Sequence, residues 1–397
     1  MANFAHCLLG VLFLSLPSIT LSNELSGSFE AGHQFAVQVT DGDVTRERPY
    51  VGFYGRYEMF RTSRQKSLLD LNAGVRGWVN NAHDGEVDLR MLNLGYATPT
   101  AKATVGFQEI RWGNSFAFFP ADLVTPRDLR DPLFSDPAWT PRPNFTLTSE
   151  FLQDDFRFQI FVTPVPRNNL YQTNWHGQKI EKPRTNSLSD FGEVFEIGAK
   201  TSLKVGPKTT ADFFYLWHWN RNSVFEMVTT PRGPELIPVV ERTHTVGVLF
   251  KRQLGNWTLH NDSVFHLSQP FQTNPDSEVL RTPVFESVFG ADIKLENDFT
   301  VSLQYQAEYW FRGQRHWVGA KAHRSFLNHE LEVDAMIYQG INNSDLWIEP
   351  GINWHFLPNW SIALRTDIIS RWSDQDTGYL YATNAQSRIM SWVSYKL

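Results

Sequence analysis

Apolar and polar residues alternate along most of this chain from about residue 25 onward. Between Phe299 and Phe311 every odd-numbered residue is apolar, and every even-numbered residue except Trp310 is polar. The segments 69–79, 330–337 and 360–371 show the same alternation. Successive side chains of a strand point to opposite sides of a sheet, so this period of two indicates strands with one apolar and one polar face. The sequence therefore predicts an all-β fold.

Strand length separates a membrane barrel from a soluble sandwich. The alternating segments run for about eleven residues, enough for a tilted strand to cross a bilayer, whereas strands of soluble sheets average about five or six. Their apolar faces often begin or end in aromatic residues, as at Tyr215, Trp217 and Trp360. Such residues form the interfacial girdles of outer-membrane barrels. We therefore predict a transmembrane antiparallel up-and-down β-barrel.

The composition excludes several other classes of protein. Hydrophobic residues make up 42% of the chain and aromatic residues 14%, yet 20% is charged and the mean hydropathy is -0.34. After the N-terminus no uncharged stretch reaches the roughly 18 to 20 apolar residues of a spanning helix. So many aromatic residues also argue against disorder. The net charge of -6 provides no basic surface, so no nucleic-acid partner is expected.

The connections between the alternating segments are of two kinds. Longer connections are predicted at 112–143, 165–190, 221–241, 268–282 and 372–384. Short turns are predicted at 61–66, near Pro99, and at 153–155, 205–208, 254–256, 296–298, 327–329 and 357–359. Outer-membrane barrels have one rim of short periplasmic turns and one of long extracellular loops. Counting through the chain gives about 18 strands, with 16 as the alternative, and both termini on the short-turn rim.

The N-terminus is typical of a cleaved signal peptide. An apolar run from Cys7 to Pro17 precedes Glu24, the first charged residue, and small residues suit cleavage after residue 22. The positive charge that usually starts a signal is missing, so a buried N-terminal hairpin or helix is the alternative. Residues 23–397 would then form a single barrel domain without cysteine, which excludes disulfides and thiolate metal sites.

The last strand indicates export to the outer membrane of a Gram-negative bacterium. Within Ile389–Leu397, one face of the strand carries the apolar residues Ile389, Val393, Tyr395 and Leu397. This pattern resembles the C-terminal strand that the outer-membrane assembly machinery reads, with Leu397 in place of the usual Phe. Outer-membrane lipid and this machinery are therefore expected partners. No feature marks a subunit interface, and a homo-oligomer stays open.

The third connection on the long rim, residues 112–143, is the candidate constriction loop. It is too aromatic for a floppy surface loop, and its centre is dense in charge of both signs. The candidate constriction residues are Asp122, Arg127, Asp128, Arg130 and Asp131. A segment folded into the lumen would turn these charges toward solute. The alternative is a rim turn held together by its own ion pairs, because Arg pairs well with carboxylates.

Two motifs in this region carry a family resemblance. Residues Phe107–Gly113 follow Gly106 and fit G-x-Q-x-x-x-W-G, and the segment Asp122–Asp131 is similar to a loop that begins N-P-x-D-x-R, with Thr125 in place of Asn. The chain thus resembles a family of largely uncharacterised Gram-negative outer-membrane barrels. The resemblance covers roughly 60 residues closely and implies a pore or export role, and it supplies no catalytic residues.

The polar faces of the strands provide the candidate lining of the pore. The candidate pore-lining residues are Asp70, Arg76, Glu308, Glu332, Asp334, Arg365, Asp367 and Arg371. Both signs of charge are present, so the lumen is mixed. Acidic residues around Asp334 could oppose Arg365 and Arg371 across the lumen and create a transverse field for polar solutes. The alternative is that these charges simply pair.

No site for covalent chemistry or for a cofactor is evident in the sequence. Ser263 and His266 are three residues apart on one strand, so their side chains should point to opposite faces, and a nucleophile needs its base within hydrogen-bond reach. Phosphate-loop and helical metal motifs are absent from the sequence. No metal site and no cofactor are expected, and the protein is not expected to be an enzyme.

These observations together predict an outer-membrane porin or export channel. It would pass a small polar or amphiphilic solute through a mixed-charge lumen narrowed by the third loop. One alternative is a barrel without a conducting pore that handles lipid or acts as an enzyme. Another is a barrel plugged by its loop that serves as a scaffold for a periplasmic complex.

Overall fold

The structure of the protein is a computed structural model. It describes residues 23–37, 44–59, 68–79, 85–116, 119–129, 141–171, 174–175, 178–180, 194–220, 224–230, 233–272, 279–311, 313–342, 345–371 and 387–396. Of the strands before Leu89 only the backbone is described, and the same holds for some later strand residues, among them Asp128 and Arg371. The expected signal peptide, residues 1–22, lies outside the described residues.

Long antiparallel strands make one 18-stranded sheet. Its first strands are β1 (Asn23–Val37), β2 (Val44–Met59), β3 (Leu68–Val79), β4 (Gly85–Ala97), β5 (Ala101–Gln108), β7 (Asn144–Leu152), β8 (Phe156–Thr163), β12 (Glu196–Gly206) and β13 (Thr209–Trp219). The sheet continues with β16 (Arg242–Leu254), β17 (Trp257–Phe271), β18 (Leu280–Lys294), β19 (Phe299–Trp310), β20 (Gly313–Phe326), β21 (Leu331–Gly340), β22 (Asp345–Leu357), β23 (Trp360–Arg371) and β24 (Arg388–Lys396).

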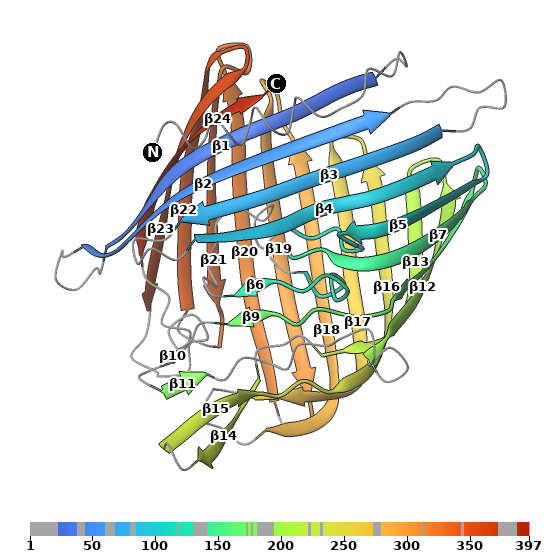
Figure 1. Ribbon diagram of the computed structural model, residues 1–397. Coiled ribbons are helices and arrows are strands. Elements are labelled where there is room, and N and C mark those ends of the chain that lie inside the picture. Colours follow the sequence, from blue (N-terminus) through green and yellow to red (C-terminus); the bar gives the residue numbers. More distant parts are fainter. Residues whose placement is uncertain are drawn as a thin grey trace.

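The sheet closes on itself into a barrel (Figure 1). Strands that follow one another in the sheet pair antiparallel, β2 lies beside β3, and β24 pairs with β1 from Ser28 opposite Lys396 to Ala36 opposite Arg388. An even number of strands brings both ends of the barrel sheet to the same rim. The predicted barrel class and the preferred count of 18 are therefore confirmed, and the alternative of 16 strands is wrong.

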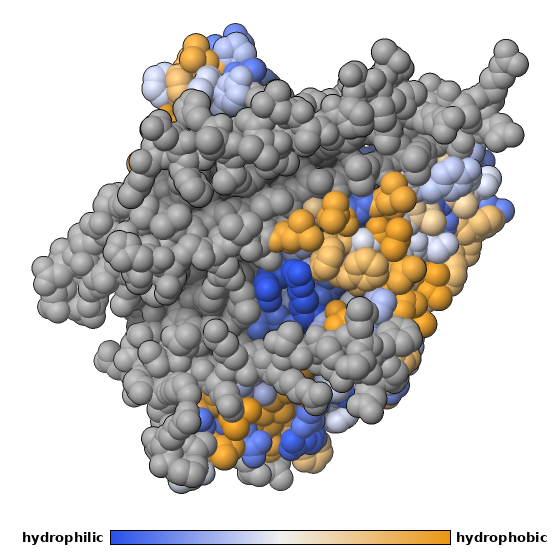
Figure 2. All heavy atoms as spheres, in the orientation of Figure 1, coloured by the Kyte–Doolittle hydropathy of each residue, from blue (hydrophilic) through white to orange (hydrophobic). Residues whose placement is uncertain are grey.

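The described side chains are arranged with apolar groups outward and polar groups inward. The exposed large apolar residues include Leu94, Leu147, Phe213, Phe289 and Leu303, whereas the buried side chains include many polar ones. Figure 2 shows hydrophobic residues gathered on the outer face over the region of β5, β7 and β13. This is the reverse of a soluble sheet, and it is the pattern of a barrel with lipid outside and polar groups inside.

Polar residues bound the apolar band on the outer face. On β16, three apolar outward side chains separate His244 from Arg252, and on β20 three separate His316 from Arg324. Each pair is eight residues apart, about 26 Å along a strand. Allowing for strand tilt, this approaches the apolar height of outer-membrane barrels, about 25 Å.

The short turns lie where the sequence predicts them. Strands β7 and β8 join through 153–155, β12 and β13 through 207–208, β16 and β17 through 255–256, and β22 and β23 through 358–359. The turn predicted at 61–66 lies outside the described residues. One predicted connection, 268–282, is too long, because β17 extends to Phe271 and β18 begins at Leu280. Gln269, Pro270 and Phe271 pair there with Thr282, Arg281 and Leu280 after a bulge, which prolongs the ladder.

Two small sheets are built from the connections. Strand β6 (Asp128–Leu129) pairs in parallel with β9 (Leu170–Tyr171). The other sheet has the order β10 (Asn174–Trp175), β11 (Gln178–Ile180), β15 (Gly233–Pro238) and β14 (Phe225–Thr230). In the described part of the chain, no helix has the length and hydropathy needed to cross a membrane.

Candidate functional site

The third loop connects β5 to β7, and its described residues, 109–116, 119–129 and 141–143, lie against the inner face of the barrel wall. Its first turn is closed by Thr125, whose Oγ1 accepts a hydrogen bond from Ile110 N at 2.9 Å and donates one to Ile110 O at 3.1 Å. Asn144, the first residue of β7, donates through Nδ2 to Val124 O at 3.0 Å. The loop therefore turns back into the lumen directly after the strand, as the sequence predicts for a loop folded inward.

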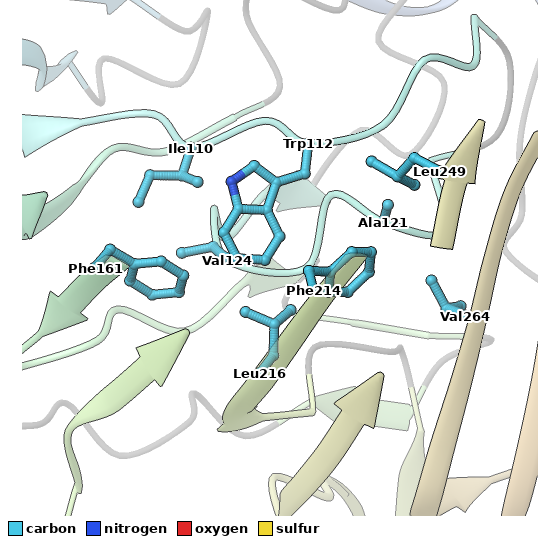
Figure 3. Close-up of a cluster of buried hydrophobic side chains, with 9 residues drawn as sticks. All are labelled: Ile110, Trp112, Ala121, Val124, Phe161, Phe214, Leu216, Leu249 and Val264. Carbon is cyan, nitrogen blue, oxygen red and sulfur yellow. The ribbon is translucent and has the colours of Figure 1, made fainter. Parts of the chain in front are cut away.

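Apolar side chains join the loop to the wall. The cluster consists of Ile110, Trp112, Ala121 and Val124 from the loop, with Phe161 from β8, Phe214 and Leu216 from β13, Leu249 from β16 and Val264 from β17. Figure 3 shows Trp112 in the middle of these residues. Its ring centroid lies 5.5 Å from that of Phe161 and 5.1 Å from that of Phe214. The cluster is a hydrophobic core inside the barrel, on an inner wall that also carries many buried polar side chains.

Glycines on the wall make room for the two rings of this cluster. A Cβ on Gly198 of β12 would lie 2.4 Å from the ring of Phe161, and a Cβ on Gly247 of β16 would lie 2.2 Å from the ring of Phe214. Both glycines stand directly opposite the aromatic residue in the neighbouring strand. The rings lie directly against the glycines, and a Cβ at either position would clash with them.

Two carboxylates hold the stretch that follows Trp112. Asp122 of the loop accepts hydrogen bonds at Oδ1 from Trp112 N at 2.7 Å and Gly113 N at 3.0 Å. Asp262 of β17 accepts at Oδ2 from Asn114 N at 2.7 Å and Ser115 N at 3.1 Å. Four consecutive backbone N–H groups are thus shared between one carboxylate of the loop and one of the wall.

Burial raises the pKa of Asp122 above its usual value of 3.8, although the backbone hydrogen bonds from Gly113 and Trp112 lower it. The positive charges of Arg127 and Arg111 also lower this pKa, to a smaller extent. Desolvation of the charged form is the dominant effect. The carboxyl of Asp122 is therefore a structural part of the loop that ionises less readily than a carboxyl in water.

The second half of the loop is tied to the next connection of the long rim. Arg127 N donates to Asn169 Oδ1 at 2.7 Å, and the Arg127 guanidinium lies 4.9 Å from the ring centroid of Phe119. Arg142 donates to Asn168 O at 3.2 Å. The pairing of β6 with β9 joins the same two segments. Residues 164–171 therefore support the third loop from the side.

The predicted constriction residues are only partly described. Asp122 bonds to backbone N–H groups, so a loop held by its own ion pairs does not account for its contacts. The backbone of Asp128 lies in β6. The side chains of Asp128, Arg130 and Asp131 lie outside the described residues, so their role as constriction residues stays a prediction.

An inward-facing ion pair is surrounded by aromatic rings near the long rim. Glu308 of β19 and Arg315 of β20 are direct neighbours in the ladder, and Arg315 Nη2 lies 2.7 Å from Glu308 Oε2. The Arg315 guanidinium lies 4.8 Å from the ring centroid of Phe271 and 5.5 Å from those of Trp310 and Trp317. The sequence predicts Glu308 as a lumen residue, but it does not indicate the three rings around its partner.

Further round the wall, Arg365 of β23 lies between two carboxylates. Its nitrogens are 3.6 Å from Asp334 Oδ1 on β21 and 3.4 Å from Glu349 Oε1 on β22. Because β21, β22 and β23 are consecutive strands, these charges pair along one wall. The prediction that Asp334 opposes Arg365 across the lumen is therefore wrong, and the alternative that these charges pair is confirmed for Arg365.

The remaining predicted lining residues have these positions. Asp367 accepts at Oδ1 from Trp347 Nε1 at 2.9 Å. Glu332 Oε2 lies 3.8 Å from His355 Nε2. Asp70 belongs to β3, Arg76 also belongs to β3, and Arg371 ends β23, but their side chains lie outside the described residues.

Ser263 and His266 lie on opposite faces of β17. His266 is buried in the inner wall, where Nδ1 lies 2.7 Å from Thr245 Oγ1 and Nε2 lies 3.4 Å from Glu286 Oε1. Ser263 instead hydrogen-bonds at 2.8 Å to Ser287 of the next strand. Their separation agrees with the strand period. Within the described residues, no group of three His, Cys, Asp or Glu side chains could hold a metal ion.

Sequence reasoning missed the wall residues that receive the loop, above all Asp262, Phe161 and Phe214. A signal for two of the strands is nonetheless present, because segments 213–217 and 246–250 are apolar or glycine at every position. A strand with two apolar faces has to be covered on both, and here the loop covers the inner one.

Comparison with solved structures identifies the fold. The chain is similar to OccAB3 of Acinetobacter baumannii (TM-score 0.57, 9% identity, 95% of this chain and 99% of the other). It is also similar to the outer membrane protein OpdK of Pseudomonas aeruginosa (TM-score 0.55, 11% identity, 94% and 99%). A third similar structure is Pseudomonas aeruginosa OccK2 in complex with glucuronate (TM-score 0.58, 10% identity, 95% and 98%).

The fold is therefore that of the Gram-negative outer-membrane porin barrels. No protein-family model matches the chain, and no curated protein matches it. These comparisons do not address the resemblance carried by Phe107–Gly113 and Asp122–Asp131, which stays a prediction.

Proposed function

We propose that the protein is an outer-membrane channel through which a small polar solute passes beside the third loop. The observation that carries this proposal is the docking of the loop inside the barrel by a dedicated apolar cluster. A loop that only capped the rim would need no such cluster on the inner wall. A loop fixed inside narrows the lumen and brings solute close to charged groups.

The solute path proposed here follows the wall opposite the apolar cluster. The loop contacts Phe161 on β8 and Asp262 on β17, and its Phe116 lies near Gly319 on β20. Beyond them, β21 to β23 present Glu332, Asp334 and Arg365 inward, with hydrogen-bonding partners along the wall. A polar solute would exchange water for these groups as it passes.

We further propose that the preferred solute carries a ring and a carboxylate. Arg315 provides a guanidinium suited to a carboxylate, and Phe271, Trp310 and Trp317 provide faces on which a ring can pack. Two similar structures hold such molecules: OccK2 is in complex with glucuronate and OpdK with vanillate. Both ligands serve here as probes.

The test is conductance of the purified protein in planar bilayers, with uptake of glucuronate, vanillate and uncharged glucose into proteoliposomes. We expect open channels and faster uptake of the two acids. Arg315→Gln should reduce this preference, whereas Arg324→Gln, which changes an outward arginine of the same strand, should not. Current that appears only after deletion of 122–131 would favour a plugged barrel, and no current in either form would favour a non-conducting one.

The membrane partners follow from the same proposal. Outer-membrane lipid would surround the apolar outer face, and the assembly machinery would read Ile389–Leu397, most of which lies in β24 and closes the barrel against β1. Deleting 389–397 should leave the protein in the periplasm, as detected by fractionation. A homo-oligomer stays open, and cross-linking in membranes would test it.

A further inference from the structure

We propose that Asp262 is the positioning residue of the third loop. Its carboxylate holds Asn114 and Ser115 on β17, and this contact determines how far the following residue, Phe116, reaches toward β20. The expected effect on current rests on the proposed function. The effect on loop position does not, and it can be measured in a barrel that conducts nothing.

The surroundings of Asp262 show that it is built to receive the loop. Besides the two backbone N–H groups, Oδ2 accepts from Ser115 Oγ at 2.7 Å and Oδ1 from Asn114 Nδ2 at 3.1 Å. The residue is 0% exposed. A buried carboxylate is costly without hydrogen bonds, and bonds to a charged acceptor are about twice as strong as neutral ones. Four donors from the adjacent loop residues Asn114 and Ser115 compensate the cost of burying the Asp262 carboxylate.

The inner wall around this carboxylate is mostly apolar, and His260, two residues earlier on β17, is its polar neighbour there. Leu249 of β16 and Val288 of β18 stand opposite Asp262 in the two ladders, and Val264 is the next inward residue on β17. All three are buried and apolar. The four hydrogen bonds to this carboxylate come from the loop, which explains why a buried acid stands on a mostly apolar stretch of wall.

The loop is held in two parts that can separate. Trp112 and Gly113 are bound by Asp122, which belongs to the loop, and Trp112 is also fixed in the apolar cluster. Neither contact involves Asp262. Its removal should therefore free residues 114–116 while Trp112 stays in place.

The freed stretch would lose its contact on the other side of β17. A Cβ on Gly319, an inward position of β20, would lie 3.8 Å from the Phe116 ring and 3.7 Å from Tyr338. Phe116 therefore lies at ordinary contact distance over the Gly319 position. Asp262 on β17 holds one end of a short span across the inner wall, and Phe116 reaches the Gly319 position on β20 at the other end.

The first experiment compares Asp262→Ala and Asp262→Asn with Asp292→Asn, which changes an inward carboxylate of β18. We expect single-channel conductance to rise about twofold in Asp262→Ala, because a freed stretch leaves a wider lumen. The conductance of Asp262→Asn should rise less, because the oxygen of a neutral amide still accepts hydrogen bonds. Asp292→Asn should match the parent protein. Equal conductance in all four proteins would contradict the effect on the pore.

The second experiment reads loop position without any current. Gly319→Cys in a Cys7→Ser background should react slowly with a water-soluble maleimide, because Phe116 covers it, and about tenfold faster once Asp262→Ala is added. Asp155→Cys, in an exposed turn between β7 and β8, should react equally in both backgrounds. An unchanged rate at Gly319→Cys would overturn the proposal even if the channel conducts.

A variant of the loop replaces Asp262→Ala if that barrel fails to fold. Asn114→Ala combined with Ser115→Ala removes the two side-chain donors and leaves β17 intact. It should raise the labelling rate of Gly319→Cys by a smaller factor than Asp262→Ala, because the backbone donors remain. No increase in a folded barrel would also overturn the proposal.

Discussion

The indole Nε1 of Trp112 donates a hydrogen bond of 2.8 Å to Oε1 of Gln159 on the inner face of β8. Gln159 in turn donates to Glu150 Oε1 at 3.0 Å, and Glu150 pairs with Arg157. The polar edge of the tryptophan is thus fixed by a chain of side chains on β7 and β8 while its rings pack against the apolar cluster. This combination sets the orientation of the ring as well as its burial.

Truncation of Trp112 should release the first part of the third loop from the barrel wall. We expect Trp112→Ala to weaken the free energy of loop docking by about 3–5 kcal/mol, because a large buried side chain is removed from a packed cluster. The folded barrel should show higher conductance and faster protease cleavage within 109–143. Trp112→Phe keeps most of the packing and loses one hydrogen bond, so it should cost about 1 kcal/mol. Equal cleavage rates in Trp112→Ala and the parent would contradict this role.

Breaking the pair of Glu308 and Arg315 should destabilise the barrel. Glu308 is 5% exposed, so its removal leaves a poorly compensated guanidinium. Loss of one partner of a buried pair costs about 3–5 kcal/mol. A double-mutant cycle of Glu308→Gln and Arg315→Met, followed by urea unfolding in vesicles, measures the coupling. Strictly additive effects would show that the two side chains do not support each other.

The two faces of β19 should respond differently to a new charge. Leu303 is an exposed outward residue, whereas its neighbour Ser302 faces inward opposite Lys321. Leu303→Arg should lower the free energy of unfolding in phospholipid vesicles by about 2–4 kcal/mol, the cost of arginine near the bilayer midplane. Ser302→Arg should have a much smaller effect. Similar losses in both variants would argue against the assignment of the faces.

Docking of the loop should strengthen as the pH falls. Because burial raises the pKa of Asp122, the docked loop binds a proton more readily than a loop released into water. The added stability is complete below the ordinary pKa of 3.8 and disappears as the pH rises through the raised pKa. Maleimide labelling cannot be used in acid. The measurement is therefore how well the docked loop is protected from cleavage by an acid-active protease. Comparison with Asp122→Asn isolates the contribution of Asp122, because Asp262 also holds the loop through a carboxylate. An Asp122 contribution to protection that grows with pH would contradict the sign.

Much of the barrel can be predicted because a strand has only two faces. In the segment 299–311 the polar positions are the inward ones, and β19 spans Phe299–Trp310. Turn residues such as Asn328 and Asp298 take positive φ at the short rim, as turn chemistry favours. The inward-folded third loop is also indicated by its aromatic content.

The contacts of the site could not be predicted from the same pattern. Alternation gives the face of Asp262 but not its partners, because Asn114 lies 148 residues away in the chain. For the same reason the alternation predicts an opposed charge ladder for Arg365, although its partners stand on the neighbouring strands of the same wall. Register between distant segments depends on packing that no local period encodes.

The apolar cluster beneath the third loop has a consequence for biogenesis. Strands β13 and β16 carry apolar side chains on both faces, Phe213 and Val248 outward, Phe214 and Leu249 inward. Lipid covers only one of these faces. Until the third loop packs onto the inner face, these strands expose apolar side chains on both faces. Exposed apolar strands of this kind aggregate during slow β-sheet assembly. Early packing of this one loop thus prevents unfinished barrels from aggregating with one another.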